Sequence, residues 1–184
     1  MAYQFKREPL TRAEADRLAN ACRTKEERLI VFTLLDTGLR VDELAKLTGD
    51  NIQWQQRCLR VQGKAGVFGG GGKGEKRWRV VPLQEERTRE LLHAYFAIND
   101  KWFCGPRYMQ RVVKDVANRA KIVRKVSPHV LRHTFASLAL QDKVSLASVK
   151  KALGHARLET TAIYLNFTDE HMLEEFDPKR RYRD

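Results

Sequence analysis

Apolar residues recur along most of the chain with the spacing of amphipathic helices. Two capping boxes, Thr11-Arg-Ala-Glu14 and Thr24-Lys-Glu-Glu27, predict helix starts, and Gly38 predicts the end of the second, mostly buried helix. Arg40 then opens a short helix, which places its charge between two packed elements. The expected helices cover residues 11–22, 24–38, 40–47, 85–96, 106–120, 128–141 and 145–154, followed by shorter ones at 158–165 and 169–176.

Three short segments, residues 52–54, 58–62 and 77–81, alternate apolar and polar positions and predict strands. The glycine-rich run GKAGVFGGGGKGEK (63–76) separates the last two and predicts a long hairpin tip. It lacks the pattern of an ATP-binding phosphate loop, because Val67 stands where that pattern has glycine and Gly74, not Ser or Thr, follows Lys73. The expected fold class is mainly α with a small three-stranded antiparallel β-sheet (α+β).

With 184 residues, the chain is long enough for one domain and a small appendage. We expect an N-terminal arm or linker remnant at 1–9, a domain at 10–167 and a C-terminal helix and tail at 168–184. The net charge of +12 indicates a polyanionic partner. Residues 101–133 hold nine Lys or Arg and one acid, a local density that argues against a generally basic protein.

Two function classes are disfavoured by composition. No apolar run is long enough to span a membrane, so we expect no membrane partner. The three cysteines are widely spaced, which indicates reduced thiols in a cytoplasmic protein rather than a metal site or a disulfide framework.

Several residues distant in sequence suit chemistry on one phosphate. They are Arg40, the pair His129 and Arg132 on one helix face, His155 after a helix-ending glycine, and Tyr164. Two arginines can fork onto the oxygens of one phosphodiester, and two histidines offer hydrogen bonds and proton transfer near neutral pH. A tyrosine offers a nucleophilic oxygen when a base or a positive pocket activates it. Each residue alone also has an ordinary structural explanation, such as a surface ion pair or a helix-end cation.

The order and spacing of these residues resemble a known family. The segments TGLRVDEL (37–44), PHVLRHTFA (128–136) and LGHARLETTAIY (153–164) look like the three signature boxes of the tyrosine recombinases, or phage integrases. The resemblance extends from about residue 11 to residue 167 and implies the tyrosine recombinase catalytic-domain fold. Carried over by position, the family's catalytic set is Arg40, a lysine, His129, Arg132, His155 and Tyr164.

The lysine has two candidates, since the family places it in the hairpin between the second and third strands. Lys64 stands at the end of the second strand, 24 residues after Arg40, which resembles the family's interval. Lys73 lies in the better string match to the family's hairpin. We favour Lys64, because a strand end fixes an ammonium group better than a glycine-rich loop does.

The resemblance implies a site-specific recombinase or integrase that acts on double-stranded DNA without metal, nucleotide or other cofactor. Tyr164 would attack the scissile phosphate, displace a 5′-hydroxyl and form a 3′-phosphotyrosyl intermediate. Arg40 and Arg132 would stabilise the pentavalent transition state. His129 would act as general base and acid toward Tyr164, the lysine would protonate the leaving oxygen, and His155 would donate to a phosphate oxygen.

Further residues are expected to assist. Glu43 is placed to hold the guanidinium of Arg40, and His133 to support the helix of Arg132 from inside. The basic helix at 106–120 is expected to lie against DNA, with Arg107, Arg111, Lys114 and Arg119 as the candidate phosphate contacts.

The family resemblance also bears on assembly. Its members usually carry a separate DNA-gripping domain before the catalytic one and assemble as tetramers on DNA. About ten residues precede the first helix here, so we expect either an excised catalytic domain or a minimal enzyme. Residues 169–176 are a candidate segment for exchange with a neighbouring subunit, and packing on their own domain is the alternative. A truncation at Asp169 that leaves DNA-dependent assembly intact would favour the alternative.

Two other functions stay open. A type IB topoisomerase shares the chemistry but rejoins the same strand, and His155 and the compact size favour recombinase over it. A non-catalytic DNA-binding regulator on the same scaffold is the second alternative.

Overall fold

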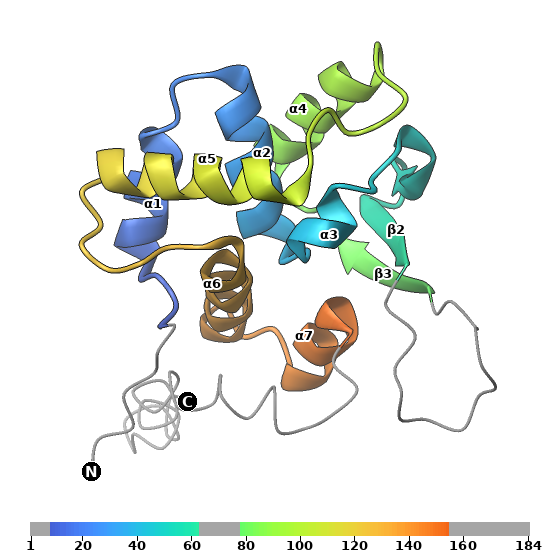
Figure 1. The fold of residues 1–184 in the computed structure, drawn as a ribbon. Coiled ribbons are helices and arrows are strands. Elements are labelled where there is room, and N and C mark those ends of the chain that lie inside the picture. Colours follow the sequence, from blue (N-terminus) through green and yellow to red (C-terminus); the bar gives the residue numbers. More distant parts are fainter. Residues whose placement is uncertain (1–7, 63–77, 155–184) are drawn as a thin grey trace, which may run out of the picture.

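The computed structural model describes residues 8–62 and 78–154, whose arrangement is shown in Figure 1. Its elements are α1 (Arg12–Asn20), α2 (Lys25–Thr37), α3 (Val41–Leu44), β1 (Ile52–Gln53), β2 (Cys58–Gln62), β3 (Trp78–Pro82), α4 (Glu86–Phe96), α5 (Pro106–Arg119), α6 (Pro128–Gln141) and α7 (Leu146–Leu153). The three strands form one antiparallel sheet in the order β1-β2-β3. The predicted class, mainly α with a small antiparallel sheet, is confirmed.

Helix α2 is the centre of the main core. It contacts α1, α4, α5 and α6, and seven of its thirteen residues are buried. A helix surrounded by others needs apolar residues on most of its circumference, which explains its nearly continuous apolar sequence. Its predicted capping box is present, because the Thr24 side chain accepts from the backbone of Glu27 and the Glu27 side chain accepts from that of Thr24.

The sheet is smaller than the sequence suggested. Strand β1 has only two residues, and β3 begins one residue later than expected, at Trp78. Leu59 of β2 pairs with Val81 of β3, and both are fully buried, so one face of the sheet joins the core. Arg79 has the same parity along β3 as Val81, which places an arginine on this inner face.

The connection from α3 to β1 also differs from the expected pattern. Helix α3 ends at Leu44 rather than near residue 47, although Leu47 is still buried. A short 3-10 turn (Gly49–Asn51) leads into the sheet, and its Asn51 side chain accepts from the backbone N–H of Thr48 at 3.0 Å. This bond holds the start of the 3-10 turn, from which the chain continues into β1.

Helix α7 lies apart from the main core. Its residues Val149 and Leu153 form a small second cluster with Ala136 of α6, and Phe135 packs against that cluster. The helix begins after Ser145, whose Oγ accepts from the Ser148 N–H, as predicted. Its contacts are with α6 and β3 (Figure 1).

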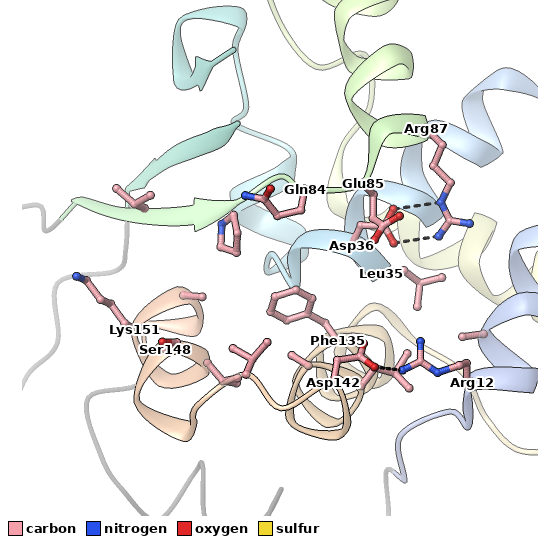
Figure 2. Close-up of a pocket in the computed structure, with 18 of the residues that line it drawn as sticks. Arg12, Leu35, Asp36, Gln84, Glu85, Arg87, Phe135, Asp142, Ser148 and Lys151 are labelled. Atoms are coloured by element: carbon pink, nitrogen blue, oxygen red, sulfur yellow. Dashed lines mark hydrogen bonds and ion pairs between the residues drawn. The ribbon is translucent and has the colours of Figure 1, made fainter. Parts of the chain in front are cut away.

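A pocket of about 1000 Å³ opens beside α7. Figure 2 shows Phe135 near its centre and Ser148 and Lys151 of α7 along one side. Its far side carries two ion pairs, Arg12–Asp142 and Arg87–Asp36. Because this space lies along α7, the helix depends on few contacts for its position.

Gly38 is the point where segments from three parts of the chain meet. It ends α2 in the left-handed region, with φ of 61°. A Cβ atom there would lie 2.5 Å from Phe135 Cδ1 and 3.0 Å from Leu153 Cδ2. Glycine is therefore required twice, by the backbone conformation and by the close approach of α6 and α7.

Gly38→Ala is expected to lower the free energy of unfolding by about 2–4 kcal/mol, because the left-handed conformation and the overpacking of Phe135 each cost about 1–2 kcal/mol. Gly49→Ala is the matched control, since its Cβ would meet only Phe96, at 3.6 Å. The control should lose less than about 1 kcal/mol. Urea denaturation measures both changes, and equal losses in the two variants would contradict the argument.

Candidate active site

Arg40 occupies the turn between α2 and α3. Its backbone is extended, with φ of −71° and ψ of 148°, and it forms the N-cap of α3. Its side chain is 39% exposed and donates from Nη1 to Oε1 of Glu43 at 2.9 Å. The backbone N–H of Arg40 donates to Oε2 of the same carboxylate at 2.8 Å. Glu43 thus lies against Arg40 in the manner proposed from the sequence.

Glu43 also binds a second arginine, which the sequence interpretation missed. Arg79 of β3 donates from Nη1 to Oε1 of Glu43 at 2.8 Å and from Nη2 to Oε2 at 2.7 Å. Both side chains are nearly buried, at 10% and 7% exposure. The signal available in the sequence was the parity of Arg79 with Val81, because a charged residue on the inner face of a strand needs a partner.

Four donors therefore converge on one carboxylate. Burial by itself would raise the pKa of Glu43, but the hydrogen bonds and charges of Arg79 and Arg40 outweigh it and lower the pKa to about 2. Glu43 is accordingly ionised throughout the physiological range. It holds two guanidinium groups in fixed positions while neutralising the charge of only one.

Arg132 lies on α6 and is 3% exposed. Its Nη1 donates to the carbonyl oxygen of Gly38 at 2.7 Å, and its Nη2 donates to that of Leu153 at 2.6 Å. These carbonyls belong to the C-terminal ends of α2 and α7. Arg132 therefore joins α6 to the ends of α2 and α7. Its partner Gly38 is two residues before Arg40.

The C-terminal end of α7 is fully hydrogen bonded. The N–H of Gly154 donates to the carbonyl oxygens of Lys150 and Lys151, at 2.9 and 3.2 Å. The Ala152 oxygen accepts from Nε of Arg79 at 2.9 Å, and the Leu153 oxygen accepts from Arg132. Helix ends normally leave four carbonyls without helical partners. Here two arginines complete the set, directly before residue 155.

His129 and His133 lie one turn apart on α6. Their Nε2 atoms are 2.7 Å apart, and the rings meet edge to face with centroids 4.4 Å apart. One Nε2 must donate and the other must accept, so the two imidazoles share one proton at this contact. His129 is exposed and His133 is half-buried. His133 therefore lies beside the candidate base, where it can fix the orientation and tautomer of the His129 ring.

The other proposed catalytic residues lie outside the described part of the chain. They are Lys64, Lys73, His155 and Tyr164. Their attachment points are nevertheless described. Gln62 at the end of β2 pairs with Trp78 at the start of β3, so both ends of the lysine-bearing segment leave the sheet together. The segment with His155 and Tyr164 starts from Gly154, next to the Arg79 side chain.

Helix α5 carries the proposed DNA contacts on its outer side. Met109, Val113 and Val116 are fully buried, and the cations point away from them. Arg107 and Lys114 are exposed, and the guanidinium of Arg111 lies over the ring of Tyr108, 5.2 Å from its centroid. Arg119 instead forms an ion pair with Glu27 of α2 at 2.5 Å, so its charge is used within the domain.

Residues 8–62 and 78–154 contain no cluster of three His, Cys, Asp or Glu side chains that would suit a metal ion. Cys22 is buried, and burial raises the pKa of its thiol to about 11, which leaves it unreactive. None of the described helices is long and apolar enough to cross a membrane.

Comparison with known proteins decides the family. The sequence pattern of the phage integrase family matches residues 8–171. The chain belongs to the phage integrase family. Tyrosine recombinase XerA of Pyrococcus furiosus is 33% identical over 161 residues, which cover 80% of this chain and 52% of XerA. XerA of Thermococcus kodakarensis is also 33% identical, over 89% of this chain and 59% of its own length.

The fold of this phage integrase family member agrees with that assignment. The crystal structure of XerA recombinase superposes with a TM-score of 0.75 and 30% identity, covering 96% of this chain and 64% of the XerA chain. The predicted tyrosine recombinase catalytic-domain fold is confirmed. The chain spans between about half and two thirds of the length of these relatives.

Glu43→Gln is expected to remove a pH-dependent part of the stability. The pKa of this carboxyl falls from 4.5 to about 2 on folding, so its contribution is complete above pH 4.5 and is lost as the pH falls toward 2. We expect Glu43→Gln to be about 3 kcal/mol less stable than the unmodified chain at pH 7, with the difference shrinking between pH 4.5 and 2. Denaturation at several pH values measures this. Glu90→Gln, at an exposed position of α4, is the control, and a Glu43 difference that stays constant with pH would contradict the assignment.

Proposed function

We propose that this chain is the catalytic part of a site-specific DNA recombinase that cuts and rejoins strands through a covalent 3′-phosphotyrosyl intermediate. The observation that carries the proposal is that Arg132 binds the end of α7 directly, while Arg40 is linked to the same helix end through Glu43 and Arg79. Arg79 adds a third guanidinium to this part of the site, and in residues 8–62 and 78–154 Arg40 and Arg79 share the single carboxylate of Glu43. Such a cluster suits a phosphodiester that gains negative charge on the way to a pentavalent transition state.

The reaction is a transesterification in which bonds are exchanged one for one. The Tyr164 hydroxyl gives its proton to His129 while its oxygen attacks the phosphorus. The bond to the 5′-oxygen breaks, and Lys64 protonates that oxygen as it leaves. Arg40, Arg132 and His155 donate to the non-bridging oxygens. A 5′-hydroxyl of a second strand reverses the step, so the ester conserves the bond energy and the reaction uses no nucleotide, metal or other cofactor.

The His129–His133 contact supports the role of His129 as base. A general base needs an unprotonated ring nitrogen and a fixed orientation. The half-buried His133 supplies a hydrogen-bond partner at 2.7 Å that fixes the imidazole of its neighbour. His133 is thus a positioning residue in the proposed reaction.

Double-stranded DNA is the proposed substrate. The net charge of +12, the exposed cations of α5 and the similarity to proteins named tyrosine recombinases support this choice. Among the four α5 candidates, Arg107, Arg111 and Lys114 are the better ones, because Arg119 is paired with Glu27. Assembly as a tetramer on DNA belongs to the same proposal, and residues 169–176 are a candidate either for exchange between subunits or for packing on their own domain.

Tyr164→Phe is expected to bind DNA with unchanged affinity and to form no covalent adduct, because the attacking oxygen is gone. The assay uses a library of nicked duplexes, in which cleavage releases a short strand and traps the protein on DNA, read on denaturing gels. Tyr95→Phe is the matched control, since it loses only the bond from its hydroxyl to the Lys101 carbonyl at 2.7 Å and should form adduct normally.

Each alternative outcome of that assay has a meaning. An adduct that persists in Tyr164→Phe would refute the assignment of the nucleophile. Absence of adduct from the unmodified chain on every DNA would favour a non-catalytic regulator, and relaxation of plasmid without strand exchange would favour a topoisomerase.

The inactive variant Tyr164→Phe also tests whether α5 contacts DNA. Removal of Arg107 or Lys114 should each reduce the steepness of log affinity against log salt concentration by about one, because each removes one phosphate contact.

Lys64→Ala is expected to slow cleavage by a factor of about 10² to 10⁴ when the leaving atom is oxygen. A substrate with sulfur at the leaving 5′ position needs no proton, because a thiol is far more acidic than an alcohol, so it should restore cleavage by this variant. Lys73→Ala, the matched control, should show no such selective rescue. If the sulfur substrate restores cleavage by Lys73→Ala instead, Lys73 is the general acid and Lys64 is not. If it restores neither variant, neither lysine is the general acid.

A further inference from the structure

Arg79 is bound by two elements that are distant from it and from each other in the sequence. Its Nη1 and Nη2 donate to Glu43 of α3, 36 residues away, and its Nε donates to the Ala152 carbonyl of α7, 73 residues away. Three donors of one planar guanidinium are thus used, two on the carboxylate and one on the carbonyl, at angles fixed by the geometry of the group. With its side chain only 10% exposed, the guanidinium has little freedom to move.

The bond pattern on Glu43 determines how Arg40 is presented. Arg79 fills a site on each carboxylate oxygen, and the backbone N–H of Arg40 fills a second site on Oε2. The Arg40 side chain therefore reaches the carboxylate through Nη1 alone. Without Arg79, Glu43 would be open to a two-pronged pair with Arg40, which would turn that guanidinium away from a phosphate and neutralise it.

The same side chain also holds the last turn of α7. Its Cδ lies 2.8 Å from the position that a Cβ of Gly154 would occupy, so the glycine is packed directly against the arginine stem. Gly154 has φ of 66° and ends the helix. Helix α7 adjoins a large pocket (Figure 2) and has only a small apolar cluster. The contact with Arg79 is therefore a major part of what holds the end of this helix in place.

We infer that Arg79 is a positioning residue for the reaction: through Glu43 it turns Arg40 toward the phosphate, and through Ala152 it fixes the end of α7. This inference rests on the proposed function, since it concerns the same site. Arg79 lies on the strand that follows the lysine-bearing segment, so one side chain ties that strand to both other parts of the site. It contacts the reacting groups only through its neighbours.

The test is the single-turnover rate of DNA cleavage at saturating DNA, measured together with the amplitude and the DNA affinity. Arg79→Met should lower the rate constant about 100-fold with the Kd for DNA within about threefold of the unmodified chain. Arg79→Lys keeps the charge and the stem but cannot hold Glu43 and Ala152 together, so its rate constant should fall about tenfold. Arg124→Met, which breaks internal ion pairs with Glu8 and Glu14 away from the site, should cleave at the unmodified rate.

The readouts separate positioning from a purely structural role. A structural role would lower the amplitude, which counts folded molecules, and leave the rate constant of the remaining molecules unchanged. That result, or an unchanged rate constant in Arg79→Lys, would overturn the inference. If Arg79→Met does not fold, Arg79→Lys decides the question alone.

A double-mutant cycle tests the path through Glu43. If Arg79 acts on Arg40 through Glu43, the loss of rate in Glu43→Gln/Arg79→Met should be less than the product of the two single losses. Fully multiplicative losses would overturn this path. Failure of the proposed function would look different, because the unmodified chain would then form no adduct and no rate constant would exist to compare.

Discussion

The end of helix α7 is the constraint on which the rest of the site depends. Its last four carbonyl oxygens are all satisfied, two by the N–H of Gly154, one by Arg79 and one by Arg132. Hydrogen bonds that involve a charged group contribute about 1.5–3 kcal/mol each, and the helix dipole adds to the attraction. For a helix whose apolar cluster is small, two such bonds are a large part of its attachment. The attachment point at Gly154, from which the segment with His155 and Tyr164 continues, is therefore held by the same arginines that form the candidate site.

This arrangement explains which features the sequence could predict. The caps at Thr11, Thr24 and Ser145 and the helix-ending glycines depend on residues within four positions, so local patterns identify them. Arg40 and Arg132 were recognised because their segments resemble the family's boxes. Arg79 was missed because its partners lie 36 and 73 residues away, and no local pattern encodes such pairs. Only its parity with Val81 marked it as an inward charge.

The same reasoning applies to Arg119 and to the size of α3. Arg119 is one of several cations on a basic helix, and the sequence gives no sign that Glu27 lies opposite, because the pair joins α5 to α2. Helix α3 ends at Leu44 although Leu47 is also buried, and the chain continues through a 3-10 segment toward the sheet. Tertiary packing, not local propensity, decided both features.

Arg40 and Arg132 illustrate two ways to keep a positive charge available inside a protein. A buried guanidinium is costly unless it is hydrogen bonded, and a carboxylate partner offsets that cost at the expense of the net charge. Arg132, at 3% exposure, is bound in the described residues by the carbonyls of Gly38 and Leu153, at the negative ends of two helices. These dipoles stabilise the cation. Arg40 is more exposed and does meet a carboxylate, but Arg79 shares that carboxylate. For Arg40, two guanidinium groups thus share one carboxylate, so the pair keeps a net positive charge, which a preorganised cationic site requires.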